Sequence, residues 1–170
     1  ALKYLSQRLF TEETRIFIVP DGIKTTKNLP GNILLANRNL VEDFEDPDVL
    51  AGYLVVEKLR SETYNPIEEL LQNISLISTF RLLTTGLIND DTLMDYADYL
   101  VTKPEEIVQS SEIIKAFNDT NLSLLPFAKA IDITGEGSLE LIEAFEIRNS
   151  PVETSLPDAN WVSLQNICNS

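Results

Sequence analysis

Residues 29–62 constrain the fold more than any other part of this 170-residue chain. They have, in order, the pattern of a turn, a short strand, a short helix at 40–44, an acidic turn and a long helix. The long helix starts at Glu45-Asp-Pro-Asp48, where Asp46 suits the N-cap and the proline suits the first turn. Its apolar residues recur at helical spacing and are numerous enough to predict a buried helix up to Glu62.

The residues before this helix predict a small sheet. Arg15–Val19 is a β-branched run ended by Pro20-Asp-Gly22, which predicts a strand followed by a turn. Residues 32–37 predict a second strand, and the polar stretch 23–28 could be an edge strand or a loop. We therefore expect an antiparallel or mixed sheet of two to four strands beside the long helix.

Elsewhere the pattern is helical. Apolar residues three and four positions apart predict helices over 2–10, 66–73, 75–84, 91–102, 104–118, 122–130 and 159–167. The stretch 139–147 fits either a strand or a helix. Because no long polar linker marks the change in composition near Asn65, residues 1–170 are predicted to form a single α+β domain. The sheet and the long helix occupy 1–65, and the helical part occupies 66–170.

The composition excludes several classes of site. Histidine is absent and cysteine occurs once, as Cys168. These counts exclude Ser-His-Asp and Cys-His catalysis, zinc sites with histidine ligands, thiolate clusters and an internal disulfide. Neither an EF-hand spacing nor a P-loop is present, so no metal or cofactor is expected. A net charge of −14, with no basic cluster larger than Lys24 and Lys27, argues against nucleic-acid binding.

Three consecutive segments carry a family resemblance: Leu29-Pro30-Gly31-Asn32-Ile33-Leu34-Leu35, Arg38-Asn39-Leu40-Val41, and Leu-Ala-Gly-Tyr-Leu-Val-Val-Glu-Lys-Leu-Arg at 50–60. In this order they resemble the edge strand, short helix and active-site helix of the HtpX-like family of zinc metallopeptidases. In that family the long helix carries His-Glu-x-x-His, whose two imidazoles hold zinc on one helix face. The resemblance ends near Asn65, and no glutamate that could be the third ligand follows it.

The chain departs from this motif at both metal-binding positions. Val56 and Arg60 occupy the histidine positions, and only the middle glutamate, Glu57, is kept. Valine has no donor atom and a guanidinium repels a cation, so no zinc-bound water of lowered pKa would form for Glu57 to activate. Zinc-dependent proteolysis is therefore not expected, whatever the ancestry of the chain.

The candidate binding residues occupy the former motif and the matched edge strand: Val56, Glu57, Arg60 and Asn32. The plainest interpretation of Glu57 is an ion pair with Arg60 one turn later, or with Lys58 or Arg38. The functional interpretation makes Arg60 a fixed cation in a cleft that binds a peptide or a carboxylate. A third possibility is an enzyme that uses Glu57 as a base on another substrate.

Other groups have simpler structural interpretations. Two acidic clusters could bind a cation, but a helix start and an ordinary turn explain them more simply: Asp90, Asp91, Asp95 and Asp98, and Asp132, Glu136 and Glu140. Four residues near the C-terminus are interpreted as the docking face of the last helix, or alternatively as a partner-binding or cleft-plugging tail: Trp161, Val162, Leu164 and Ile167.

The leading hypothesis is a non-catalytic pseudo-peptidase, or a module that binds a protein or peptide, on a degraded metallopeptidase scaffold. The alternatives are a metal-independent enzyme that uses Glu57 and Arg60, and a structural domain of a larger membrane-attached protein. No segment of this chain is apolar over enough residues to cross a bilayer. The resemblance implies a bacterial membrane-tethered or extracytoplasmic setting, with attachment through a segment outside this chain.

Overall fold

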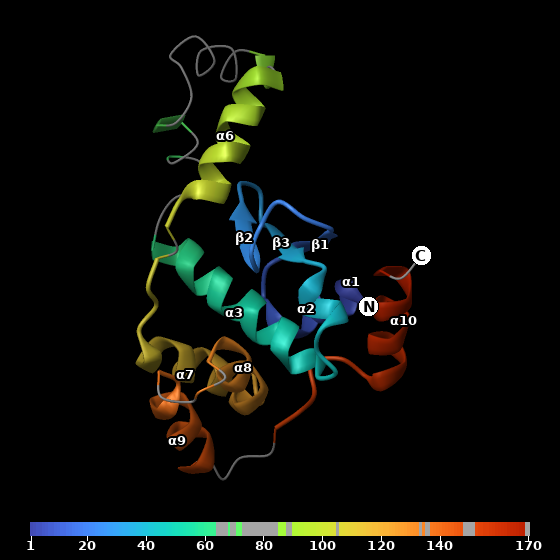
Figure 1. Cartoon of the computed structure of the whole chain (residues 1–170), viewed down its shortest axis with the longest axis vertical. Helices are drawn as coiled ribbons and strands as arrows, with labels where there is room; N and C mark the ends of the chain where they lie inside the picture. The colour runs from blue at the N-terminus through green and yellow to red at the C-terminus, as the bar shows by residue number, and fades with distance from the viewer. Residues whose placement is uncertain are drawn as a thin grey trace.

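The structure is a computed structural model of the chain (Figure 1), and it describes residues 1–63, 68, 71–72, 85–87, 90–104, 106–132, 134, 137–147 and 152–168. Its elements run in the order α1 (Leu2–Leu9), β1 (Arg15–Val19), β2 (Thr26–Leu29), β3 (Ile33–Asn37), α2 (Asn39–Glu42), α3 (Pro47–Thr63), α6 (Asp90–Thr102), α7 (Ser110–Asp119), α8 (Leu124–Ile131), α9 (Leu139–Ile147) and α10 (Asp158–Cys168). A small sheet beside a long helix, surrounded by further helices, confirms the predicted α+β class.

The sheet is mixed and has three strands within the described residues, in the order β1-β3-β2. β1 runs parallel to β3, and β2 runs antiparallel to it. The turn between β2 and β3 places Gly31 and Asn32 at φ of +87° and +56°, a conformation that favours glycine and that asparagine tolerates. The strand order makes β2 an edge strand, so the ambiguous stretch 23–28 is a loop at 23–25 and an edge strand at 26–28.

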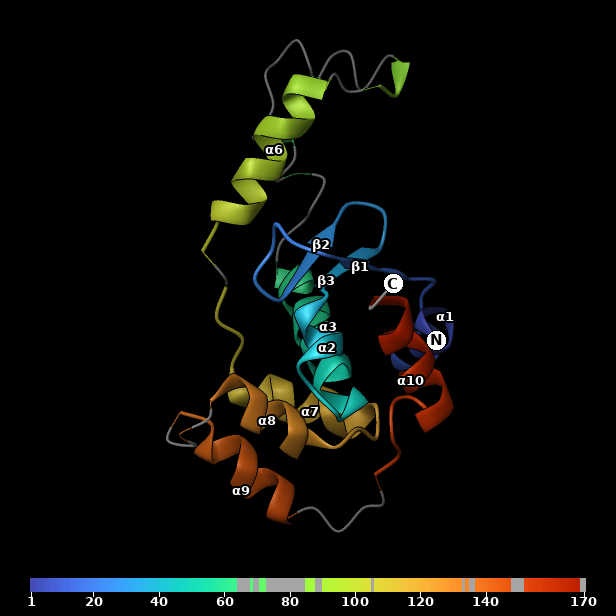
Figure 2. The ribbon, with the colours of Figure 1, turned by 45° about the vertical axis from the view of Figure 1, so that its right-hand side comes forward.

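α3 is the central helix of the fold. It is a single helix, and Asp46 Oδ1 accepts a hydrogen bond from the Asp48 backbone N–H at 2.9 Å, which confirms the predicted N-cap. α3 contacts β2 and β3 on one side and α7 and α8 on another (Figure 2). Because it is covered from several directions, its apolar residues Leu50, Ala51 and Leu54 are fully buried.

α8 approaches α3 at a glycine. A Cβ added to Gly52 would lie 2.7 Å from Cβ of Phe127, closer than packed atoms allow. The Phe127 ring packs edge-on against Tyr53 and tilted against Phe117, with centroid distances of 5.3 and 5.4 Å. These aromatic contacts fix the end of α8 beside the face of α3 that carries Tyr53.

The predicted helix at 104–118 begins later than expected. Residues 104 and 106–109 are extended, and α7 starts at Ser110 behind a capping box formed by Gln109 and Glu112. The prediction that Pro104-Glu-Glu106 starts a helix is therefore wrong, because the cap that begins the helix lies further along the chain. The stretch 139–147 is a helix, whereas the predictions for 66–73 and 75–84 fall almost entirely outside the described residues.

α10 docks beside α1 and α2 (Figures 1 and 2). Trp161 and Leu164 are buried, and Gln165 Nε2 donates to the carbonyl oxygens of Val41 and Phe44 at 3.1 and 3.3 Å. The amide thus satisfies carbonyls at the end of α2 that have no partner within that helix. The docking interpretation of the last helix is confirmed for Trp161 and Leu164 and is wrong for Val162, which is exposed, while the side chain of Ile167 lies outside the described part. No described residue of α10 lines the cleft beside Arg60, which contradicts the cleft-plugging alternative.

Candidate functional site

Glu57 is buried between α3 and the edge strand. Its side chain faces β2, and the residue is only 3% exposed. Oε1 accepts a hydrogen bond from the backbone N–H of Asn28 at 2.7 Å, and the Thr26 hydroxyl lies 3.4 Å from Oε2. Because alternate residues of a strand share a face, Thr26 and Asn28 both meet the helix at this level. The carboxylate therefore joins α3 to the outer edge of the sheet.

The ion-pair interpretation of Glu57 is confirmed, with Arg60 as its partner. Arg60 Nη1 lies 3.2 Å from Glu57 Oε2, the contact expected for residues three positions apart on a helix. The other two suggested partners are wrong, because Lys58 pairs with Glu12 and Arg38 pairs with Glu42.

Burial raises the pKa of Glu57 above its ordinary 4.5, against the opposing effects of the Asn28 N–H, Arg60 and Lys27. A raised pKa is common among catalytic carboxylates. A base must, however, also reach the proton that it removes. Both oxygens of Glu57 are already engaged by the protein, which makes this side chain a poor general base.

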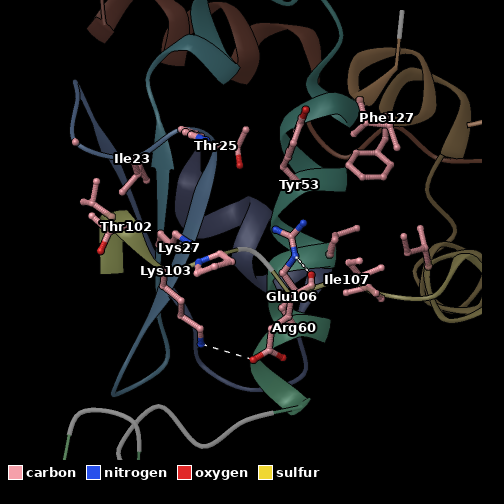
Figure 3. A pocket seen from close by; sticks show the side chains of 18 of the residues that line it. Ile23, Thr25, Lys27, Tyr53, Arg60, Thr102, Lys103, Glu106, Ile107 and Phe127 are labelled. Carbon is pink, nitrogen blue, oxygen red and sulfur yellow. Dashed lines mark hydrogen bonds and ion pairs between the residues drawn. The ribbon is translucent and has the colours of Figure 1, made fainter. Parts of the chain in front are cut away.

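Arg60 joins α3 to a second part of the chain. While Nη1 binds Glu57, Nε donates to the backbone carbonyl oxygen of Glu106 at 3.1 Å. Glu106 belongs to the extended segment between α6 and α7, and its carboxylate pairs with Lys103 at 3.6 Å (Figure 3). The guanidinium is therefore a fixed cation, as predicted, and its partners come from α3 and from the chain after α6.

A cleft of about 970 Å³ opens beside Arg60 (Figure 3). Its lining comes from the loop and strand at 21–27, from Tyr53, Val56 and Arg60 on α3, from the chain at 101–108, and from Phe127 and Ile131 on α8. Glu57 does not line this space, although it lies directly behind Arg60. Val56 and Arg60 thus line the cleft, whereas Glu57 is closed off from it.

Asn32 lies apart from the other candidates. It is exposed in the turn between β2 and β3, and its carbonyl oxygen accepts a hydrogen bond from the Arg15 N–H at 2.8 Å. It does not line the cleft. The structure thus brings Val56, Glu57 and Arg60 together on α3 and gives Asn32 a role in the turn.

Sequence reasoning missed the wall of the cleft formed by Lys103, Pro104, Glu106, Ile107 and Val108. The apolar spacing there favoured a helix. The helix starts instead behind Gln109, which is not a preferred N-cap residue, so the sequence held no strong boundary signal.

Three residues of the two acidic clusters have structural roles, namely Asp132, Asp90 and Asp91, and Glu136 lies outside the described residues. Asp132 accepts hydrogen bonds from the N–H groups of Thr134 and Gly137 at 2.9 and 2.6 Å, which confirms an ordinary turn there. Asp90 and Asp91 occupy the first turn of α6. In the part of the chain that the structure describes, no three His, Cys, Asp or Glu residues are placed to hold a metal ion. No helix in that part is long and apolar enough to span a membrane.

Comparisons of the chain with protein-family models, curated proteins and solved structures find no match. The resemblance to HtpX-like metallopeptidases therefore stays a prediction. The geometry of α3, of β2 and of the cleft beside them is therefore the observation that bears on function.

Proposed function

We propose that this chain is a non-catalytic binding module whose cleft receives a peptide or an extended segment of another protein. One observation carries the proposal. The acid that could perform chemistry is sealed by Asn28 and Arg60, whereas the space beside it stays open over Val56 and Arg60.

The cleft has the size and the mixed lining of a ligand site. Such sites have volumes of about 300–1,000 Å³ and combine apolar walls with a few placed polar groups. Accessible apolar and aromatic surface comes from Tyr53, Ile107 and Ile131, and Arg60 supplies a cation that is held by contacts with Glu57 and the Glu106 carbonyl. An immobilised guanidinium loses little freedom when a carboxylate or carbonyl group meets it.

Ile107 is an apolar side chain positioned for burial by a ligand. It lines the cleft and yet is 96% exposed. The neighbouring Glu106 carbonyl is held by Arg60, so this part of the segment is already fixed against α3. Fully burying an isoleucine side chain contributes about 1.5–3 kcal/mol, which a ligand packed against Ile107 would gain in part.

The rival enzyme hypothesis needs Glu57 to reach a substrate. The side chain would have to leave the Asn28 amide and Arg60 and turn into the cleft, which would leave a buried N–H without an acceptor. A degraded zinc-peptidase scaffold accounts for the single helix α3 beside an antiparallel edge strand, and it supports binding rather than proteolysis once both imidazoles are gone.

The test uses two isoleucines of similar exposure. Ile107→Ser removes an apolar side chain from the cleft, and Ile147→Ser removes one that is 78% exposed on α9 and does not line the cleft. The purified protein is incubated with an array of short peptides of varied composition. It should bind some of these peptides and leave them uncleaved. Ile107→Ser should lose most of that binding, and Ile147→Ser should keep it.

Three results would refute the proposal. They are an array with no bound peptide, equal binding by both variants, and cleavage of the bound peptides. Metal analysis of the same preparation should find no stoichiometric zinc, and bound zinc would restore the metallopeptidase hypothesis.

A further inference from the structure

The cleft has a positively charged lining, although the protein carries a net charge of −14. Four cationic side chains line it: Lys24, Lys27, Arg60 and Lys103. Among the described residues, two carboxylates line it with them, those of Asp21 and Glu106. If Glu57 is added because it lies directly behind Arg60, the cations of the described lining still outnumber its acids.

Other hollows of the described surface do not share this balance. The hollow between α1 and α7 contains three cations and four acids, namely Arg8, Lys58 and Lys115 with Glu12, Glu62, Glu112 and Asp119. The hollow beside α1 and β1 has equal numbers, namely Lys3 and Arg15 with Glu12 and Glu13. The hollow between α2 and α8 is acidic, with Lys129 against Asp43, Glu45 and Asp46. Among these four hollows of the described surface, the cleft is therefore the one lined by more cations than acids.

The cations come from three separate parts of the chain. Lys24 and Lys27 belong to the loop and strand at 21–27, Arg60 lies on α3, and Lys103 follows α6. Lys27 is close enough to act on Glu57, because its charge helps to lower the pKa of that carboxyl. Charges of one sign that line a hollow with apolar walls concentrate their field inside it.

We propose that the ligand is an acidic peptide segment in which an apolar side chain neighbours the carboxylates. The carboxylates would lie among Lys24, Lys27 and Lys103, and the apolar side chain would pack against the exposed Ile107. This inference rests on the proposed function and adds the chemistry of the ligand to it. The net negative charge of the protein repels an acidic partner from most of its surface, so the cleft is the place where such a partner can be held. The positions of the lysines also set where along the peptide its carboxylates bind.

The experiment titrates the protein into three fluorescein-labelled peptides and follows fluorescence anisotropy. The acidic peptide alternates aspartate or glutamate with leucine and phenylalanine. The neutral version replaces each acid by its amide, and the basic version replaces each acid by lysine. The acidic peptide should bind about tenfold more tightly than the neutral one, and the basic peptide should bind most weakly. Added salt should narrow the acidic-to-neutral ratio, because exposed charges are screened.

A pair of matched double variants separates the cleft from the rest of the surface. Lys24→Gln with Lys27→Gln should bring the affinity for the acidic peptide down to that for the neutral peptide and leave the neutral affinity unchanged. Lys3→Gln with Lys115→Gln removes two exposed lysines that do not line the cleft and should keep the preference. Circular dichroism should show that each variant is folded.

The outcomes distinguish the two proposals. Equal affinity for acidic and neutral peptides, with both lost in Ile107→Ser, would overturn the charge preference and leave the binding function in place. Tightest binding of the basic peptide would overturn the preference too, because the overall charge of the protein would then decide. No binding of any version would overturn both proposals.

Discussion

Replacing Glu57 by alanine is expected to loosen the contact between α3 and β2. The side chain is buried, and it accepts hydrogen bonds from the Asn28 N–H and from Arg60. Alanine leaves the Asn28 amide buried without its acceptor, which costs about 1–3 kcal/mol. Loss of the buried Cγ methylene group removes roughly another 0.8 kcal/mol.

Two effects reduce this cost. Arg60 keeps the Glu106 carbonyl as a partner, and its side chain is 19% exposed on the cleft, so water can reach it. Burial also raises the pKa of Glu57, which shows that desolvation of the charged form outweighs its favourable contacts. The net destabilisation expected for Glu57→Ala is therefore about 1–3 kcal/mol.

Glu57→Gln separates shape from charge. The glutamine amide oxygen can still accept the Asn28 N–H, while the ion pair with Arg60 is lost and so is the cost of burying a charge. The destabilisation should be smaller, about 0.5–1.5 kcal/mol.

Urea unfolding followed by circular dichroism measures both variants, with Glu62→Ala as the control. Glu62 is exposed on the same helix, so its change should stay within about 0.5 kcal/mol. If Glu57→Ala costs less than about 1 kcal/mol, or if glutamine costs as much as alanine, then the carboxylate does not join α3 to the edge strand as described.

Two further predictions concern packing and pH. Gly52→Ala should destabilise the folded state by about 1–3 kcal/mol despite the better helix propensity of alanine, because the new Cβ meets Phe127. The same substitution made in a Phe127→Ala background should cost less if this contact is the cause, and equal costs would contradict it. Burial raises the pKa values of Glu57 and Asp48 above their ordinary 4.5 and 3.8, so the folded state binds more protons than the unfolded state just above those values. Their contribution to stability is complete below the ordinary pKa values and is lost as the pH rises through the folded ones. Urea midpoints should therefore increase on acidification from pH 7 toward 4.5, with a shallower slope in Glu57→Gln, and parallel slopes would refute the role of Glu57.

Local signals in the sequence were sufficient for the elements that lead into the site. The β-branched run of β1 and the Asp-Pro start of α3 determine their structure within a few residues, so both predictions are confirmed. β2 is polar and stayed ambiguous, because its place depends on Glu57, which lies far along the chain and accepts the Asn28 N–H. The extended segment at 106–109 was missed for the same reason, since Arg60 fixes it through a backbone carbonyl that no side-chain pattern reveals.

The residue at position 60 explains how the cleft can keep its shape without a metal. A histidine there would be oriented by zinc, as the predicted ancestry implies, whereas Arg60 is oriented by Glu57 on one side and by the Glu106 carbonyl on the other. Different nitrogens of the planar guanidinium, Nε and Nη1, make these two contacts, an arrangement that the single ammonium group of a lysine cannot reproduce. The same guanidinium that excludes a cation therefore attaches the 101–108 wall to α3, turns Glu57 away from the cleft, and adds positive charge to the lining. If the predicted ancestry holds, the loss of a metal ligand and the proposed attraction of anions to the cleft both follow from this one side chain.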